Sequence, residues 1–200
     1  MKSKFYKEGN KKLILFFNGW GMDELIVSHL DRTGYDLLVL YDYRDLDITF
    51  PDFSSYDEFF VVGWSMGVMI SSLFDDIDAK RIAINGTLKP IDDKYGIPEK
   101  IYKLTVRGFS ERSCEKFMCR MFEDVPPIEK FSNRAFEDVK EELENLMGIE
   151  AKYISYDKKL ISDNDVIIPT ENQKNYWRNY ELIKGGHCPF FNYTSWSELL

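Results

Sequence analysis

The stretch Phe59–Gly67, which reads FFVVGWSMG, predicts the centre of the fold. Its first four residues are aromatic or β-branched, which is typical of a buried β-strand. The next five match the pattern G-x-S-x-G, and the apolar stretch Ser65–Phe74 then favours a buried helix. A strand, a sharp turn that carries a serine and a helix together form a nucleophile elbow. We therefore expect Ser65 on a strained turn at the carboxyl edge of a sheet.

Further apolar stretches predict strands, and helix-like stretches separate them. The other predicted strands are Leu13–Phe17, Leu37–Tyr41, Arg81–Ile84, Tyr153–Tyr156 and Tyr180–Ile183. The other predicted helices are Asp23–Leu30 and Glu171–Trp177. Apolar residues stand at consecutive positions, as in parallel strands that are buried on both faces. The alternation predicts an α/β fold with a mostly parallel sheet of about six strands.

Residues 98–148 break this alternation, because they read as helices without a strand. They carry one apolar stripe, formed by Phe117, Met118, Met121 and Phe122. Ser132 is a candidate N-cap for a second helix, which Gly148 would end. A helical insert between two strands predicts a cap over the site. Since no repeat or linker divides the chain, we expect one domain over residues 1–200 with this cap insert within it.

Length, charge and cysteine content exclude several classes of protein. Two hundred residues can bury a core without disulfides. A net charge of −8 argues against a nucleic-acid binder. No apolar run approaches the roughly 18 residues of a membrane span, and no signal-peptide pattern is present. Three cysteines without zinc spacing predict a protein of the reducing cytoplasm. Since no Gly-rich phosphate loop occurs, we expect no metal and no organic cofactor.

A serine hydroxyl needs a base to become a nucleophile, and the chain has two histidines. His187 lies in the stretch Gly185–Phe190 (GGHCPF), directly after the last predicted strand. His29 lies beside the apolar residues of a predicted helix, where a packing role is the simpler interpretation. The sequence therefore favours His187 as the base of Ser65.

The base in turn needs a carboxylate that fixes its tautomer. The stretch Ser162–Pro169 (SDNDVIIP) follows the fifth predicted strand, and both Asp163 and Asp165 qualify by position. Asp165 is favoured because the hydrolase pattern places an Asp four residues before Pro, although either residue could simply form the turn. The chain order Ser, Asp, His is the one expected for an α/β-hydrolase.

An oxyanion formed at Ser65 needs two N–H donors. The backbone of Met66 offers one. The stretch Asn18–Met22 (NGWGM) follows the first predicted strand, where a second donor belongs, and we expect the Trp20 amide to serve. The alternative is that Asn18 and Gly19 form a simple turn.

Four of these segments together resemble the BioG-type pimeloyl-[acyl-carrier protein] methyl ester esterases, a group of small α/β-hydrolases. They are Phe17–Gly21, Gly63–Gly67, Asp165–Pro169 and Gly185–Phe190. The resemblance covers nearly the whole chain, and it implies an α/β-hydrolase fold that is trimmed at its start, with three strands leading to the serine. The chain departs from the wider hydrolase pattern at Asn18, where His-Gly is usual.

The resemblance implies a serine esterase of biotin biosynthesis. Ser65 would attack the methyl ester at the far end of a pimeloyl chain that an acyl carrier protein holds as a thioester. Methanol would leave, and water would free the pimeloyl carrier protein. His187 would shuttle the proton and Asp165 would orient the imidazole. The amides of Trp20 and Met66 would hold the oxyanion.

The predicted cap offers residues for the acyl chain and for the acyl carrier protein. Trp64 and the apolar stripe would line the acyl pocket, although the stripe could equally dock the cap on the sheet. Residues 99–135 hold eight Lys and Arg against six Asp and Glu. A basic stripe for the acidic carrier protein would consist of Arg112, Lys116 and Arg120. The alternative is a solvated helix face.

Two other functions stay open at this point. A general short-chain carboxylesterase or thioesterase would use the same three side chains, because acyl transfer to serine is the same chemistry for each. An inactive hydrolase fold that serves as a binding protein would lack one of them, whereas this chain holds a candidate for every position.

Overall fold

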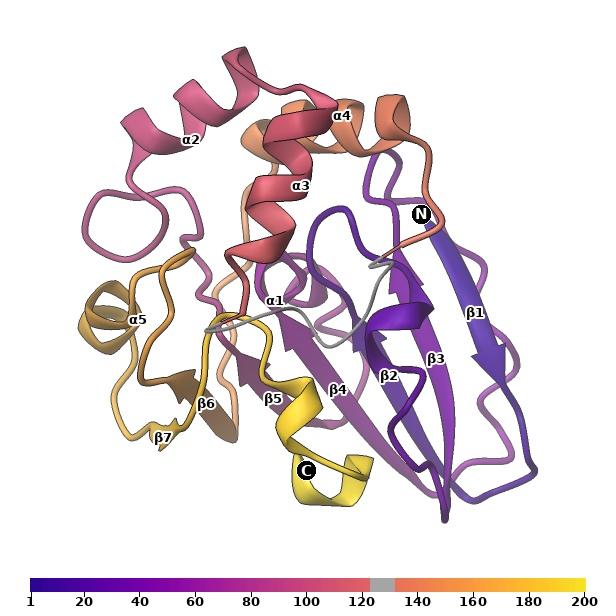
Figure 1. The fold of residues 1–200 in the computed structure, drawn as a ribbon. Coiled ribbons are helices and arrows are strands. Elements are labelled where there is room, and N and C mark those ends of the chain that lie inside the picture. The colour runs from indigo at the N-terminus through magenta and orange to yellow at the C-terminus, as the bar shows by residue number, and fades with distance from the viewer. Residues whose placement is uncertain (123–131) are drawn as a thin grey trace.

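The computed structural model describes residues 1–122 and 132–200. Within them, a twisted sheet has the strand order β1-β3-β2-β4-β5-β6-β7 (Figure 1). The strands are β1 (Lys2–Tyr6), β2 (Lys12–Phe17), β3 (Tyr35–Tyr41), β4 (Glu58–Trp64), β5 (Lys80–Ile84), β6 (Lys158–Ser162) and β7 (Glu181–Ile183). Neighbouring strands are parallel except for β1, which pairs antiparallel with β3. The parallel α/β architecture expected from the sequence is confirmed.

Two strand predictions need correction. Tyr153–Tyr156 is not a strand, and β6 begins only at Lys158, where the chain pairs with β5. Tyr153 is 95% exposed to solvent, and the Tyr156 hydroxyl donates a hydrogen bond to the Val68 carbonyl. Neither residue belongs to the sheet. The edge strand β1 was not predicted, because it reads KSKFY and is mostly exposed. Four strands rather than three therefore lead to the serine.

Helices flank the sheet and connect its strands. They are α1 (Met66–Ser71), α2 (Glu99–Arg107), α3 (Glu111–Cys119), α4 (Phe136–Asn145) and α5 (Thr170–Tyr176), with short 3₁₀ turns at Glu24–Val27, Leu146–Gly148, Phe190–Asn192 and Trp196–Glu198. The predicted helix over Asp23–Leu30 is reduced to the first of these turns, which Asp23 caps. Ser132 does not cap α4, since its hydroxyl accepts a hydrogen bond from the Arg134 backbone and the helix begins four residues later.

The residues predicted as a cap form α2, α3 and α4 between β5 and β6. Figure 1 shows these three helices at the end of the sheet to which β4 and β5 point. Residues 123–131 of the predicted insert lie outside the described residues. The division into one domain with a cap insert stays a prediction. No helix among the described residues has the length and apolar character needed to cross a membrane.

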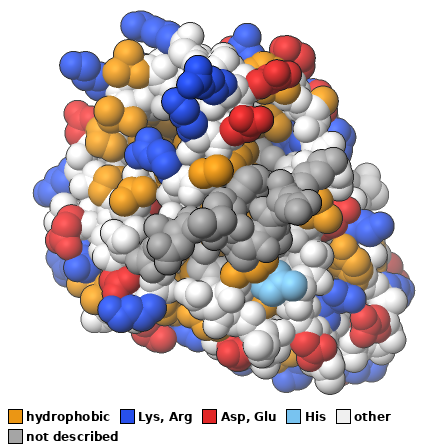
Figure 2. Space-filling view, viewed as in Figure 1, with side chains coloured by type: hydrophobic (Ala, Val, Ile, Leu, Met, Phe, Trp, Pro, Cys, Tyr) orange, Lys and Arg blue, Asp and Glu red, His pale blue; other side chains and the backbone are white. Residues whose placement is uncertain are grey.

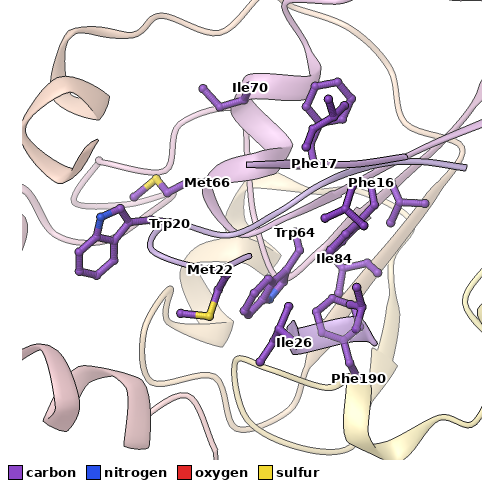
Figure 3. Close-up of a cluster of buried hydrophobic side chains, with 14 of the residues drawn as sticks. Phe16, Phe17, Trp20, Met22, Ile26, Trp64, Met66, Ile70, Ile84 and Phe190 are labelled. Carbon is purple, nitrogen blue, oxygen red and sulfur yellow. The ribbon is translucent and has the colours of Figure 1, made fainter. Parts of the chain in front are cut away.

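The core lies against β2 and β4, whose residues are buried almost without a break. Figure 3 shows large side chains gathered beneath the carboxyl ends of these strands. The Trp64 and Phe190 rings meet edge to face with centroids 5.1 Å apart, and Phe16 meets Phe190 in the same way at 5.5 Å. Full burial of each such ring contributes about 1.5–3 kcal/mol. This packing fixes the strand ends from which the site is built.

Candidate active site

Ser65 stands on a strained turn between β4 and α1. Its backbone φ and ψ are 57° and −122°, a left-handed conformation that a side chain rarely adopts. The turn is possible because its neighbours are glycines. A Cβ at Gly63 would lie 2.7 Å from the Val68 Cα, and one at Gly67 would lie 2.0 Å from the Phe17 carbonyl oxygen. The turn therefore presses the serine loop against the end of β2.

Three buried side chains form a hydrogen-bonded chain at this turn. Ser65 Oγ lies 2.8 Å from His187 Nε2, and His187 Nδ1 lies 2.7 Å from Asp165 Oδ2. The serine is 6% exposed, and the histidine and the aspartate are more deeply buried. In this arrangement a hydroxyl can pass its proton to an imidazole whose other nitrogen faces a carboxylate.

Asp165 is held by donors on both of its oxygens. Its Oδ1 accepts hydrogen bonds from the backbone N–H groups of Ile167 and Ile168 at 2.8 and 3.0 Å. Its Oδ2, which faces His187, also accepts one from Gln173 Nε2 at 2.8 Å. The sequence analysis missed Gln173, and its position on the polar helix α5 gives no sign of this contact. These donors fix the carboxylate plane toward the imidazole.

Asp163, the other candidate acid, lies elsewhere. Its carboxylate pairs with Lys184 at 2.5 Å and accepts a hydrogen bond from the Gly185 N–H at 3.2 Å. The hydrogen bond from Lys184 and the Gly185 N–H hold the pKa of the Asp163 carboxyl below its usual range. Asp163 thus braces the start of the His187 loop, while Asp165 touches the imidazole.

The segment Asn18–Met22 follows β2 and faces the serine turn. Three of the four backbone N–H groups over Gly19–Met22 donate hydrogen bonds within the protein. The Gly19 N–H donates to Asn18 Oδ1 at 2.9 Å, and the Gly21 N–H donates to Glu142 Oε2 at 3.0 Å. The Met22 N–H donates to the Gly19 carbonyl at 3.3 Å. The Trp20 N–H has no hydrogen-bond acceptor among the described residues. It is therefore available to a ligand. Met66 begins α1, where a backbone N–H has no preceding helical carbonyl to bond.

A mostly apolar pocket opens beside Ser65 and His187. Its walls come from the segment after β2, the serine turn, the loop after β6 and the cap helices, with lining residues that include Trp20, Met66, Ile97, Ile101, Tyr102, Leu143, Val166 and Ile167. Of the described lining residues, only Arg120 brings a Lys, Arg, Asp or Glu side chain. Groups of three or more His, Cys, Asp or Glu that could hold a metal ion do not occur among the described residues. The lining of the pocket suits a mostly apolar ligand.

Comparison with known proteins identifies the family. The family model described as "Pimeloyl-ACP methyl esterase BioG" matches residues 1–199. The chain belongs to the BioG family. A crystal structure of BioG from Haemophilus influenzae superposes with a TM-score of 0.90 at 34% identity, covering 100% of this chain and 99% of that one.

Two sequence relatives and a more distant solved structure are also similar to this BioG-family chain. An uncharacterized protein of Haemophilus influenzae is 36% identical over 217 residues, which cover 100% of this chain and 99% of the relative. A malonyl-[acyl-carrier protein] O-methyltransferase of Bacteroides fragilis is 37% identical over 182 residues, which cover 85% of this chain but 37% of that protein. A putative aryl esterase from Burkholderia cenocepacia, at 15% identity, a TM-score of 0.67 and coverage of 95% and 88%, shares the α/β-hydrolase fold.

The predicted pocket residues of this BioG-family chain divide into two groups. Trp64, Phe117 and Met121 line the pocket. Met118 and Phe122 do not, which corrects the expectation of a single stripe. Phe117 and Met121 are four residues apart and face the pocket, whereas Met118 and Phe122 each stand one residue further along, which turns a side chain by about 100° on a helix. Met118 packs toward the segment Asn18–Met22, since a Cβ on Gly21 would lie 3.0 Å from the Met118 Cε. The Phe122 ring lies 5.9 Å from that of Phe191.

The predicted docking residues lie on and just beyond α3. Arg112 and Lys116 are exposed on the helix, and Arg120 is the exposed residue that follows it and reaches the pocket. Glu111 and Glu115 are exposed on the same helix. Figure 2 shows Lys and Arg side chains beside Asp and Glu side chains over the cap, so the basic residues are not a uniform patch.

Two further side chains hold the His187 loop. The Asn85 side chain donates hydrogen bonds to the His187 carbonyl at 2.9 Å and to Ser162 Oγ at 2.7 Å, and it accepts one from the Ser162 N–H at 2.7 Å. Trp64 Nε1 donates to the same His187 carbonyl at 2.9 Å. Sequence reasoning missed Asn85, although a polar residue directly after β5 lies at the same sheet edge as the serine.

Two other reactive side chains, His29 and Cys188, do not belong to the hydrogen-bonded chain of Ser65, His187 and Asp165. His29 lies 3.1 Å from the Phe190 carbonyl oxygen through Nε2 and stacks on Phe191 with ring centroids 4.3 Å apart. Cys188 follows the histidine directly, but burial raises the pKa of its thiol far above the ordinary value. A buried thiol with a raised pKa is a poor nucleophile, whereas the Ser65 hydroxyl lies within hydrogen-bond distance of His187.

Proposed function

We propose that this BioG-family protein, a carboxylic ester hydrolase, cleaves the methyl ester of pimeloyl-[acyl-carrier protein] methyl ester. The products are pimeloyl-[acyl-carrier protein] and methanol. The single observation that carries the proposal is the hydrogen-bonded chain of Ser65, His187 and Asp165 at the floor of an apolar pocket. Because the serine is nearly buried in an apolar pocket, the site suits an uncharged ester at the end of an acyl chain better than a charged substrate.

In the first step, Ser65 Oγ attacks the ester carbonyl carbon and its proton passes to His187 Nε2. The carbonyl oxygen becomes an oxyanion, which the N–H groups of Trp20 and Met66 stabilise. When the tetrahedral intermediate collapses, the bond to the methoxy oxygen breaks. His187 returns the proton to that oxygen, and methanol leaves an acyl group on the serine. Asp165 holds the imidazole in the required tautomer throughout.

In the second step, water takes the place of methanol. His187 accepts a proton from the water as its oxygen attacks the acyl-serine carbonyl, and the same two N–H groups stabilise the second oxyanion. Breakage of the bond to Ser65 Oγ releases the pimeloyl carboxylic acid, which loses its proton to the solvent, and His187 gives the other proton of the water to the serine. No metal or cofactor enters this proposal.

The apolar pocket supports selectivity for the far end of the chain. Ile101 and Val166 line the pocket and are 53% and 50% exposed, so an apolar rim continues from the serine toward the surface. A chain that enters past this rim presents its methyl ester to Ser65 and keeps its thioester outside. Position rather than intrinsic reactivity then decides which carbonyl is attacked.

An acyl carrier protein is the proposed partner. The relative from Bacteroides fragilis, a small part of which this chain matches, is named for malonyl-[acyl-carrier protein], which supports a carrier-bound substrate. Arg112 and Lys116 are exposed on α3, and Arg120, just beyond the helix, lines the pocket. All three would face acidic residues of the carrier. The phosphopantetheine arm would then run from this surface into the pocket.

The test is to incubate the protein with methyl-pimeloyl carrier protein and to follow the mass of the acyl carrier protein. The proposal predicts the loss of one methyl group, with the thioester intact. No loss, together with hydrolysis of p-nitrophenyl butyrate, would keep the ester hydrolase and overturn the substrate. Cleavage of the thioester in place of the methyl ester would overturn the proposed selectivity, and inactivity on both would point to a binding protein.

A further inference from the structure

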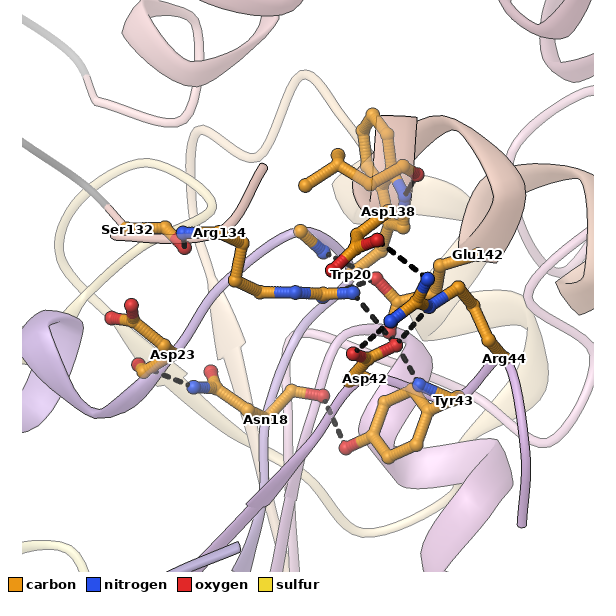
Figure 4. A network of polar contacts seen from close by, with 12 residues as sticks. Asn18, Trp20, Asp23, Asp42, Tyr43, Arg44, Ser132, Arg134, Asp138 and Glu142 are labelled. Carbon is orange, nitrogen blue, oxygen red and sulfur yellow. Dashed lines mark hydrogen bonds and ion pairs between the residues drawn. The ribbon is translucent and has the colours of Figure 1, made fainter. Parts of the chain in front are cut away.

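Helix α4 of the cap holds the Trp20 segment at two points (Figure 4). The Trp20 indole Nε1 donates a hydrogen bond to the Val139 carbonyl at 2.8 Å. The N–H of Gly21, the next residue, donates to Glu142 Oε2 at 3.0 Å. Val139 and Glu142 are three residues apart and so lie on one face of α4. Helix α4 therefore holds the Trp20 side chain and the peptide that follows Trp20 through one hydrogen bond each.

The Glu142 carboxylate is itself held tightly. The residue has no exposed surface. Its Oε1 accepts a hydrogen bond from the Tyr43 N–H at 2.7 Å, and its Oε2 also pairs with the Arg134 guanidinium. Arg134 Nη2 lies 2.9 Å from Asp42 Oδ1, which connects the carboxylate to the end of β3. Since its donors come from three separate segments, the carboxylate has little freedom to rotate.

The cap does not need Glu142 merely to be seated on the sheet. Arg44, which follows β3, already pairs with Asp138 of α4 at 2.6 Å. A buried carboxylate is costly unless donors satisfy it, and an apolar side chain would fill the same volume at lower cost. Of the contacts that an apolar residue could not make, those to the Tyr43 N–H, to Arg134 and to the Gly21 N–H, only the last reaches the Trp20 segment.

We propose that Glu142, braced by Arg134, is a positioning residue for the oxyanion hole. By holding the Gly21 N–H while the Val139 carbonyl holds the indole, it fixes the peptide that follows Trp20 together with the Trp20 side chain, and so orients the free Trp20 N–H toward the pocket. This inference rests on the proposed function, in which that N–H stabilises the oxyanion. Glu142 does not line the pocket, so it acts on the reaction through Trp20.

The test compares Glu142→Gln with the wild type in two assays. The first gives kcat and KM for the methyl ester. The second gives Ki for a trifluoromethyl ketone, in which Ser65 adds to the ketone carbonyl and the resulting oxyanion occupies the same hole. Removal of one oxyanion donor costs about 10²–10³-fold in kcat. We expect misdirection of one donor to lower kcat by about 10–100-fold, to raise Ki by the same factor and to change KM less than about threefold.

The matched control is Asp138→Asn, which lies on the same helix and loses an ion pair to Arg44 without touching the Trp20 segment. It should keep the wild-type kcat and Ki while lowering the melting temperature. If Glu142→Gln fails to fold, Trp20→Phe removes the indole tether while keeping a ring in the pocket wall, and kcat and Ki should again change in parallel.

Wild-type kcat and Ki in a folded Glu142→Gln or Trp20→Phe variant would overturn the inference. So would a fall in kcat without a change in Ki, or an equal effect of Asp138→Asn, because these would indicate general loosening of the cap. Failure of the proposed function looks different: the ketone would not inhibit the wild-type protein, or Ser65→Ala would retain turnover.

Discussion

Gly67 lies so close to the Phe17 carbonyl oxygen that a Cβ at position 67 would stand 2.0 Å from it. The first turn of α1 therefore rests on the last residue of β2. Because Ser65 precedes Gly67 and the Trp20 segment follows Phe17, this contact sets the distance between the nucleophile and the proposed oxyanion donor. The atom met at position 67 is backbone, which has no rotamer with which to move aside.

Gly67→Ala should thus damage both stability and activity. Overpacking against a rigid neighbour typically costs about 1–3 kcal/mol in the free energy of unfolding. We expect a loss of that size or larger, and a fall in kcat/KM of at least about 100-fold. Gly148→Ala is the matched control, because nothing lies within 4 Å of the added Cβ. Denaturant unfolding and ester hydrolysis measure both effects. Equal behaviour of the two variants would contradict the close contact.

Asp165→Asn and Asp163→Asn form a second matched pair. The first variant faces His187 with an amide in place of the carboxylate and loses the acceptor that selects the imidazole tautomer. We expect kcat to fall by about 10³–10⁴-fold. The second variant loses a surface ion pair with Lys184, and its kcat should stay within about tenfold of wild type. Steady-state kinetics on one methyl ester would decide, and a larger loss in Asp163→Asn would reverse the assignment.

The sequence could not decide which of these two aspartates contacts His187. The serine turn could be predicted because its strand, glycines and helix are contiguous. Both aspartates lie in one loop at suitable positions, and only the folded loop shows which carboxylate meets His187. Asn85 reaches the His187 loop from a distant strand, and Glu142 reaches Gly21 across 121 positions. Such pairings depend on packing that no local pattern encodes.

The same reasoning explains the errors in the fold. Strand β1 joins the sheet edge through its backbone while its charged side chains face water, so it lacks the apolar run that revealed the inner strands. In the cap, the sequence analysis joined two neighbouring rows of apolar residues into one stripe. Only the row of Phe117 and Met121 lines the pocket, whereas Met118 packs toward Gly21 and Phe122 toward Phe191.

Asp42 should make stability depend on pH in the acid range. Burial raises the pKa of its carboxyl, but hydrogen bonds from Arg44 and Lys2 and the charge of Arg134 outweigh this and hold the pKa well below 3.8. Because the pKa of the carboxyl is lower in the folded than in the unfolded protein, ionised Asp42 stabilises the fold. This contribution is complete at a pH above the ordinary pKa and is lost as the pH falls below about 4. The free energy of unfolding should thus be nearly level from pH 7 to 5 and then decline.

Asp42→Asn checks the origin of that decline. The variant should lose about 3 kcal/mol at pH 7, because it removes one carboxylate partner from each of two guanidinium groups, and that of Arg134 is buried. It should also show a shallower decline below pH 4 than the wild type. Urea unfolding at a series of pH values gives both quantities, and an unchanged slope would exclude Asp42 as a source of the acid sensitivity.

Charge reversal tests the docking surface. Arg112→Glu should lower kcat/KM for the carrier-bound methyl ester by about 10-fold at low salt, because it places like charge against an acidic partner. It should leave a small soluble ester unaffected, since Arg112 does not line the pocket. Lys4→Glu on β1 serves as the control for net charge and should leave both rates unchanged. Equal kcat/KM for the carrier-bound ester in wild type and Arg112→Glu would remove this surface from the account.

The central claim is that Ser65 is the nucleophile, and methanol release by Ser65→Ala tests it most directly. The side chain is 6% exposed and the alanine is smaller, so the fold should persist. The measurement is the rate of methanol release from methyl-pimeloyl carrier protein by wild type and variant under identical conditions. The account predicts a rate lower by about 10⁴-fold or more in the variant. A loss of less than tenfold would contradict it.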